Sequence, residues 1–311
     1  MRTAIPIAVI FAMLLPVGPA AAEVTTETIE YRDGETVLEG LIACDKDTQK
    51  RRPGVIVFHE WWGLNDYARM RAMQLAEMGY IVLAADIYGK GVRAEMPEQA
   101  AKLAGKFRKD TALMRSRVKA ALEALRSDVR VDPSKIAAVG YCFGGTAALE
   151  LARSGAKLKA VVSFHGGLST SAPARRGKFK PRVLILHGGD DPHVSQSEVH
   201  AFKDEMRAAR ADWQVNSYGG AVHSFTNPDS GDDPTDGVAY HKEADRRSWK
   251  AMALLFADTI GLPMEKPSKA AKLGKFAKDK VAAPTGTAGR KAGEAVKRGA
   301  LWVKDKVTGK D

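Results

Sequence analysis

Short, almost uninterrupted apolar runs recur along the chain and predict buried strands. A strand of a parallel sheet, covered on both faces, typically has this pattern. The runs lie at 54–59, 80–85, 135–139, 158–164 and 182–186, and a last strand is predicted at 213–218. Near the start, 24–31 alternates Thr or Glu with apolar residues, which indicates a half-exposed edge strand, and 36–44 is its hairpin partner.

Segments between the predicted strands have helical periodicity. The first helix is capped by Asn65 or Asp66 and runs to about Met78, with Gly79 as its stop. Further helices are predicted at 97–126, as two helices joined near 109–110, and at 146–152, 196–209 and 239–260. Strands that alternate with helices predict an α/β fold, with a mostly parallel central sheet and helices on both faces. Ligands of such sheets bind at the carboxyl ends of the strands.

A cysteine occupies the turn between the predicted strand at 135–139 and the helix at 146–152. Cys142 has glycines two residues before it and two and three residues after it. This is the nucleophile-elbow pattern with sulfur in place of oxygen, because a Cβ at the glycine positions would clash with the strand or the helix. The helix N-terminus favours the thiolate over the thiol. The alternative is a buried cysteine in a glycine-rich turn.

A nucleophilic thiol needs a base, and the base needs an orienting acid. Cys142, Asp191 and His223 each follow a predicted strand, in the nucleophile–acid–histidine order of α/β-hydrolases. Asp190 is an alternative acid. Three other histidines also end strands and are interpreted as hydrogen-bonded support: His59, His165 and His187.

The strand ending at His59 leads into a loop that can complete an oxyanion hole. Such a hole needs two backbone N–H groups. Phe143, directly after the nucleophile, supplies one, and Trp61 is the candidate for the other. Glu60 follows five apolar residues, so it is either a solvated loop charge or, as we favour, a carboxylate directed at the site.

Five stretches together resemble the dienelactone hydrolase family, and the resemblance extends over about 24–262. They are Gly-Tyr-Cys-Phe-Gly-Gly, His-Glu-Trp-Trp-Gly-Leu-Asn, Asp-Ile-Tyr-Gly, Gly-Gly-Asp-Asp-Pro and Val-His-Ser-Phe. The resemblance implies a single-domain, monomeric α/β-hydrolase with the triad Cys142, Asp191 and His223, and with Phe143 and Trp61 as oxyanion donors. It also implies that the glutamate matching Glu60 holds the thiol at rest until substrate binds.

The resemblance further implies positions that contact the substrate. Well-studied family members hold a substrate carboxylate with two arginines, where this chain has Lys90 and Asn227. Lys90 offers a point charge but no bidentate clamp, and Arg93 could substitute. Trp62, beside Trp61, could form an apolar wall for an acyl group. Tyr88, from the Asp-Ile-Tyr-Gly stretch, is counted with these supporting or substrate-contacting residues.

Both ends of the chain differ from the body. Residues 1–22 have a short basic start, an apolar run at 4–17 and small residues at 20–22, which predicts a secretory signal peptide cleaved before Glu23. The enzyme domain is then 23–263, in a periplasmic or secreted protein. The formal net charge is +11, of which the segment 265–311 carries +8, with 13 Lys/Arg against 5 Asp/Glu.

The basic tail at 264–311 has one apolar helical face with lysines around it. It could bind an anionic membrane or envelope surface, or be a solvated, disordered extension. Export makes nucleic acid an unexpected partner. The apolar positions are Ala292, Val296, Ala300, Val303 and Val307.

The most favoured function is an exported hydrolase of small esters or lactones, of the carboxymethylenebutenolidase type, acting through an acyl-cysteine. The alternatives are a carboxylesterase or thioesterase for larger acyl groups, and a catalytically weak envelope-binding protein. No His/Cys spacing predicts a metal site, and no cofactor is expected. Cys44 is interpreted as a small core residue, with a disulfide to Cys142 as the less favoured alternative.

Overall fold

A computed structural model describes residues 23–46, 48 and 50–261. The predicted signal peptide and the whole basic tail at 264–311 lie outside these residues. The strands are β1 (Val24–Asp33), β2 (Thr36–Asp45), β3 (Arg52–Phe58), β4 (Ile81–Ala85), β5 (Val131–Tyr141), β6 (Ala160–Phe164), β7 (Arg182–Gly188) and β8 (Trp213–Tyr218). The α-helices are α1 (Asp66–Glu77), α2 (Pro97–Lys109), α3 (Thr111–Ser127), α4 (Phe143–Arg153), α5 (Gln196–Ala209) and α6 (Lys242–Thr259).

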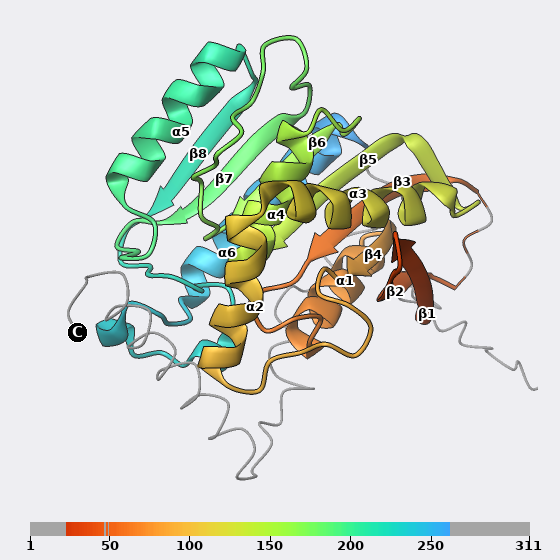
Figure 1. The fold of residues 1–311 in the computed structure, drawn as a ribbon, viewed down its shortest axis with the longest axis horizontal. Helices are drawn as coiled ribbons and strands as arrows, with labels where there is room; N and C mark the ends of the chain where they lie inside the picture. The colour runs from red at the N-terminus through yellow and green to blue at the C-terminus, as the bar shows by residue number, and fades with distance from the viewer. Residues whose placement is uncertain (1–22, 47, 49, 262–311) are drawn as a thin grey trace, which may run out of the picture.

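The strands form one sheet in the order β1-β2-β4-β3-β5-β6-β7-β8. β1 pairs antiparallel with β2, and β2 pairs antiparallel with β4. All other neighbours, from β4 to β8, are parallel. The predicted α/β fold with a mostly parallel sheet is therefore confirmed, and the alternating first strand is an edge strand (Figure 1).

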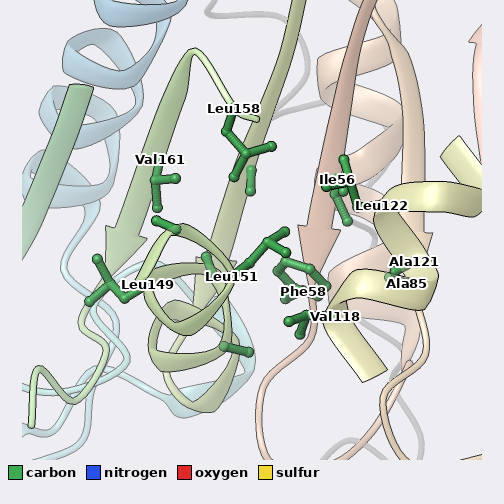
Figure 2. Packing of buried hydrophobic residues seen from close by; sticks show 14 of the residues in the cluster. Ile56, Phe58, Ala85, Val118, Ala121, Leu122, Leu149, Leu151, Leu158 and Val161 are labelled. Atoms are coloured by element: carbon green, nitrogen blue, oxygen red, sulfur yellow. The ribbon is translucent and has the colours of Figure 1, made fainter. Parts of the chain in front are cut away.

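Alternate residues of the central strands feed two cores, one on each face of the sheet. Ile56 and Phe58 of β3 pack into one core, and Val55 and Val57 into the other. The first core is completed by α2, α3, α4 and α5, and the second by α1 and α6. Figure 2 shows part of the first core between β3, α3 and α4. Burial on both faces explains why these strands are continuously apolar.

Caps account for the helix boundaries. The Asn65 side chain accepts a hydrogen bond from Ala68 N (3.2 Å) and begins α1. Asp110 separates α2 from α3, and its carboxylate accepts from Leu113 N (2.9 Å). The two-helix prediction for 97–126 is thus confirmed.

The last helix begins later than predicted, at Lys242 instead of residue 239. Ala239 N donates to His223 O (3.1 Å), and His241 N donates to Phe225 O (3.0 Å). These bonds hold the chain extended beside the loop that carries His223, so the segment before Lys242 supports that loop and is not helical.

Cys44 is buried on β2, and both cysteines are free thiols. The disulfide alternative is wrong, and the interpretation of Cys44 as a core residue agrees with its 4% exposure. Within the part of the chain that the structure describes, no helix has the length and apolar character needed to cross a membrane.

Candidate active site

Three strand ends bring Cys142, Asp191 and His223 together. Cys142 directly follows β5, Asp191 follows β7, and His223 follows β8. His223 Nε2 lies 3.1 Å from Cys142 Sγ, and His223 Nδ1 lies 2.9 Å from Asp191 Oδ2. The imidazole therefore lies between the thiol and the carboxylate, with one ring nitrogen close to each of them. This is the arrangement of a nucleophile, a base and an orienting acid.

Cys142 adopts a backbone conformation that side-chain-bearing residues seldom adopt, with φ 52° and ψ −117°. The turn lets α4 start at the next residue, Phe143. A Cβ on Gly140 would lie 1.9 Å from Gly144 O, and a Cβ on Gly144 would lie 2.2 Å from Phe58 O. Both positions therefore require glycine, and the strained elbow presents the half-buried thiol at the start of a helix.

Electrostatics favour a charged Asp191–His223 pair. Asp191 is buried, and although burial opposes its charge, His223 and the His193 backbone N–H lower the pKa of its carboxyl group. Burial likewise opposes the charge on His223, but Asp191 and Cys142 raise the pKa of His223 well above its ordinary value. Asp190 is exposed, and its carboxylate accepts from Gly220 N (3.0 Å). The structure thus brings Asp191, and not Asp190, to His223.

His165 supports the backbone of the elbow. Its Nδ1 accepts a hydrogen bond from Cys142 N (3.2 Å), and its Nε2 lies 2.7 Å from Thr226 Oγ1. Burial lowers the pKa of His165 well below its ordinary value, so the ring is neutral, with the proton on Nε2. Thr226 in turn is hydrogen-bonded to Tyr67 (2.6 Å).

His59 supports the chain at the ends of β3 and β4. Its Nδ1 donates to Glu60 O (2.6 Å), and its Nε2 accepts from Ile87 N (3.2 Å), which ties the ends of β3 and β4 together. His187 differs, because its buried Nε2 has no hydrogen-bond partner within the described residues.

Glu60 is 3% exposed and is bound by neutral donors. Its carboxyl group accepts from Ser224 Oγ (3.1 Å) and from Asn227 Nδ2 (2.8 Å). Burial raises the pKa of Glu60, and these two hydrogen bonds oppose the rise only in part. The thiol of Cys142 contacts His223 instead of Glu60. The arrangement differs from the resting state implied by the family resemblance, in which the glutamate holds the thiol.

The two positions expected to bind a substrate carboxylate are both engaged elsewhere. Lys90 is exposed and forms ion pairs with Glu30 of β1 and Glu39 of β2 (3.7 Å to Glu39). Asn227 is 4% exposed and donates to Glu60. The structure therefore places Asn227 beside Glu60 and directs Lys90 toward the β1–β2 hairpin.

The predicted oxyanion donors are the backbone N–H groups of Phe143, at the start of α4, and of Trp61, in the loop after β3. Phe143 is the first residue of α4, so its N–H has no acceptor within the helix. Tyr88 donates its hydroxyl proton to Trp61 O (3.0 Å), and its ring lies 5.5 Å from that of Phe143. Trp61 and Trp62 are half-buried, with ring centroids 5.2 Å apart. Tyr88 thus connects the two segments that carry the candidate donors.

Sequence reasoning missed two residues that contact the site. The His193 ring lies 5.1 Å from the His223 ring, and Ser224 binds Glu60 from the residue next to His223. Burial, aided by the charge of His223, lowers the pKa of His193 to about 4. A signal for His193 was available, because it lies two residues after Asp191 in the same loop.

No group of three or more His, Cys, Asp or Glu side chains within the described residues is arranged to hold a metal ion. The chemistry available at these strand ends is that of a thiol, an imidazole, carboxyl groups and backbone N–H donors.

The parallel sheet, the elbow and the nucleophile–acid–histidine geometry define an α/β-hydrolase. The sequence profile of the dienelactone hydrolase family matches residues 38–260. The chain belongs to the dienelactone hydrolase family, and it is a hydrolase acting on ester or lactone bonds.

Similar proteins agree with this assignment. The chain is 43% identical to m3DLH, with a TM-score of 0.74, over 76% of this chain and 99% of that one. It is 42% identical to the dienelactone hydrolase-like promiscuous phosphotriesterase P91 from metagenomic libraries, with a TM-score of 0.72 and the same coverage. It is also 41% identical over 140 residues to the uncharacterized Caenorhabditis elegans protein K02A2.1, covering 44% of this chain and 89% of that protein.

Proposed function

We propose that the protein hydrolyses small carboxylic esters or lactones through an acyl-cysteine intermediate on Cys142. The observation that carries the proposal is the 3.1 Å separation of His223 Nε2 from Cys142 Sγ, with Asp191 bound to the opposite ring nitrogen. The half-buried thiol lies beside a free helix N-terminus, where a developing oxyanion is stabilised.

Before acylation, His223 holds the proton of Cys142, so an imidazolium lies beside the thiolate. The sulfur attacks the carbonyl carbon, and the backbone N–H groups of Phe143 and Trp61 bind the resulting oxyanion. The carbon–oxygen ester bond then breaks, and His223 returns its proton to the leaving alkoxide. In a lactone this oxygen stays attached to the acyl group. Asp191 stabilises the imidazolium that exists between these steps.

Deacylation uses the same imidazole in reverse. His223 takes a proton from water, the hydroxide oxygen attacks the thioester carbon, and the carbon–sulfur bond breaks. The sulfur leaves as a thiolate, and His223 keeps the proton taken from water, which restores the starting ion pair. Both half-reactions use one imidazole, and His223 Nε2 lies 3.1 Å from the Cys142 sulfur.

The first test is hydrolysis of an aryl acetate, an unsaturated lactone and an acyl thioester by the wild-type protein and by Cys142→Ala. We expect turnover of at least one compound by the wild type and its loss in the variant. Rapid quenching during aryl acetate turnover is expected to trap one acetyl group on Cys142, detected by peptide mass. Equal rates for both proteins would contradict the proposal, and preference for the thioester would favour the thioesterase alternative.

Phosphotriester hydrolysis is a second candidate activity. It is favoured by the 42% identity to the promiscuous phosphotriesterase P91, which this chain matches over 99% of the length of P91. The same thiolate would attack phosphorus and expel an aryloxide. An aryl phosphotriester added to the panel tests it, and a rate unchanged by Cys142→Ala would exclude this route.

Export remains part of the proposal. The apolar run at 4–17 and the small residues at 20–22 support cleavage before Glu23 and a periplasmic or secreted location. N-terminal sequencing of the protein recovered from fractionated cells tests it, since an intact Met1 in the cytoplasmic fraction would contradict export. Comparing membrane association with and without 264–311 tests the envelope-binding role of the tail.

A further inference from the structure

The edge of the sheet at which the parallel strands begin lies opposite the active site (Figure 1). We call it the amino edge, and it comprises the segments that lead into β3 to β8. From Lys135 to Cys142 the chain rises about 3.3 Å per residue, which separates the two edges by about 20 Å. Charges on the amino edge are therefore screened from the triad, because the Debye length in physiological salt is about 8 Å.

Exposed cations follow one another along the amino edge. Lys159 N, before β6, donates to Ile136 O (2.8 Å), and Arg182 N, at the start of β7, donates to Lys159 O (3.0 Å). These bonds place Lys135, Lys159 and Arg182 on neighbouring strands. Within the described residues, six exposed cations of this edge form no ion pair. They are Lys50, Arg51, Lys135, Lys157, Lys159 and Lys180.

Carboxylates of the amino edge leave most of this charge uncompensated. Asp128 is already paired with Arg130 (2.6 Å), and Asp212 is paired with Arg182 (2.9 Å). Asp132 and Glu77, which lie on β5 and at the end of α1, offset only part of the free positive charge. The amino edge is therefore a basic surface.

A hollow of about 400 Å³ lies where the chain enters β7 and β8. Arg176, Lys180 and Arg210 contribute to its lining, and all three are exposed and without an ion pair in the described part of the chain. Asp212 is the one carboxylate among its described lining residues, and it is held by Arg182. Phosphate oxygens accept hydrogen bonds from several such cations at once, so the hollow suits a phosphate group.

Two further features favour a lipid bilayer as the source of this phosphate. Val129, in the turn before β5, is 78% exposed, and an apolar side chain beside cations is suited to a membrane interface. The described chain also ends at this edge, because Gly261 O accepts a hydrogen bond from the hydroxyl of Tyr80 (3.2 Å), directly before β4. The segment 265–311, with a formal charge of +8, continues the chain from there.

We propose that the amino edge docks onto an anionic phospholipid bilayer and that the active site faces away from the lipid. Each lysine or arginine held at an anionic membrane surface strengthens binding about fivefold. The inference adds a surface of the folded domain to the tail considered above. It does not depend on the reaction at Cys142, since the two edges are separate.

The first experiment measures sedimentation of the full-length protein with lipid vesicles. We expect binding to vesicles of equal parts phosphatidylcholine and phosphatidylglycerol but not to phosphatidylcholine alone, and weaker binding as salt is added. The triple variant Arg176→Gln, Lys180→Gln and Arg210→Gln is expected to bind the mixed vesicles at least about tenfold more weakly. Far-UV circular dichroism checks that the variant is folded.

The matched control removes three exposed lysines that lie on helices outside the amino edge. It combines Lys109→Gln, Lys119→Gln and Lys242→Gln, on α2, α3 and α6, and its affinity is expected to stay within about twofold of the wild type. An equal fall in both triple variants would mean that only net charge matters and would overturn the proposal. An unchanged affinity in the amino-edge variant would leave the tail as the binding segment and would also overturn it.

Val129→Ser separates a bilayer from a soluble anionic polymer. Loss of the apolar side chain is expected to weaken binding to the mixed vesicles about threefold and to leave binding to heparin unchanged. Heparin that binds more tightly than the vesicles, with no effect of Val129→Ser on either, would assign the amino edge to a polymer and contradict the bilayer.

The second experiment reads the orientation of the bound protein. Lysines are acetylated with acetic anhydride, with and without the mixed vesicles, and each site is quantified by peptide mass. We expect the vesicles to protect Lys135 and Lys180 but not Lys109 and Lys242, and alkylation of Cys142 by iodoacetamide to stay unchanged. Protection of Lys109 and Lys242 with Lys135 and Lys180 still reactive would place the active-site edge on the lipid and refute the proposed orientation.

Discussion

Asp191 and Glu60 are two buried carboxyl groups at the same edge of the sheet, and their protonation is shifted in opposite directions. Asp191 is 7% exposed and Glu60 is 3% exposed, so burial penalises the charge of both. Asp191 faces His223, and its pKa is lowered, whereas Glu60 faces Ser224 and Asn227, and its pKa is raised. The comparison shows that the charge of the neighbours, more than the depth of burial, decides which carboxyl group is ionised.

The largest effect is expected from removing the charged member of this pair. Asp191→Asn is expected to lower kcat/KM about 10⁴-fold, because the imidazole loses its orienting carboxylate. Asp190→Asn is the matched control, since the adjacent carboxylate binds Gly220 N, and we expect a change within about twofold. Steady-state kinetics on the best ester decide between them, and a larger loss in Asp190→Asn would reverse the assignment of the acid.

A second effect is expected when Glu60 loses a donor. Asn227→Ala leaves one carboxyl oxygen without the 2.8 Å hydrogen bond, and we expect the free energy of unfolding to fall by about 2 kcal/mol. Asn216→Ala on β8, where the side chain is hydrogen-bonded to Gln214 and Tyr218 near the surface, should cost less than about 0.5 kcal/mol. Urea unfolding at pH 7 measures both, and equal losses would show that Glu60 does not depend on Asn227.

A third prediction concerns the pKa of His193, which burial lowers and the neighbouring Asp191 carboxylate raises. His193 lies beside Asp191, but burial lowers its pKa from 6.5 to about 4. The unfolded chain therefore binds a proton below pH 6.5 that the folded protein binds only near pH 4, so stability falls as the pH drops through this window. His193→Gln should remove about 1.4 kcal/mol of the loss between pH 8 and pH 5.5.

His200→Gln, which changes an exposed histidine on α5, is the control for this titration. Its unfolding free energy should follow the wild-type pH profile. If His193→Gln also follows that profile, the imidazole of His193 is as accessible to protons in the folded protein as in the unfolded chain.

The smallest effect is expected from Glu60→Gln. The folded pKa of Glu60 is raised above the ordinary value of 4.5, so its contribution to stability is complete below that value and is lost as the pH rises through the folded pKa. Glu60→Gln lacks this loss and should become more stable relative to the wild type as the pH increases. Glu35→Gln, at an exposed turn position, should show no such trend, and a flat difference for Glu60→Gln would mean that Glu60 is ionised throughout.

Local patterns predicted the fold and the nucleophile well. The uninterrupted apolar runs gave strands in the correct order, and Gly140 and Gly144 marked the elbow because the steric requirement involves residues only a few positions apart. The first helix and the division of 97–126 also followed from short-range signals, namely the caps at Asn65 and Asp110. The start of the last helix was wrong because backbone bonds to the His223 loop, far away in sequence, override its helical periodicity.

The partners of individual side chains could be identified only from the tertiary structure. Asp190 and Asp191 are adjacent in sequence and equally suited to be an acid, and only the packing of β7 against β8 directs one of them to His223. Lys90 was a reasonable anion-binding candidate until the β1–β2 hairpin placed Glu30 and Glu39 beside it.

The sequence by itself determined the order of strands and helices, the elbow at Cys142 and membership of the dienelactone hydrolase family, since these depend on periodicity and sterics within short segments. Only the tertiary structure decided which acid meets His223 and which neutral donors surround Glu60. The physical reason is that hydrogen bonds and charge pairs act over a few ångströms between side chains from separate elements, so they depend on how those elements pack.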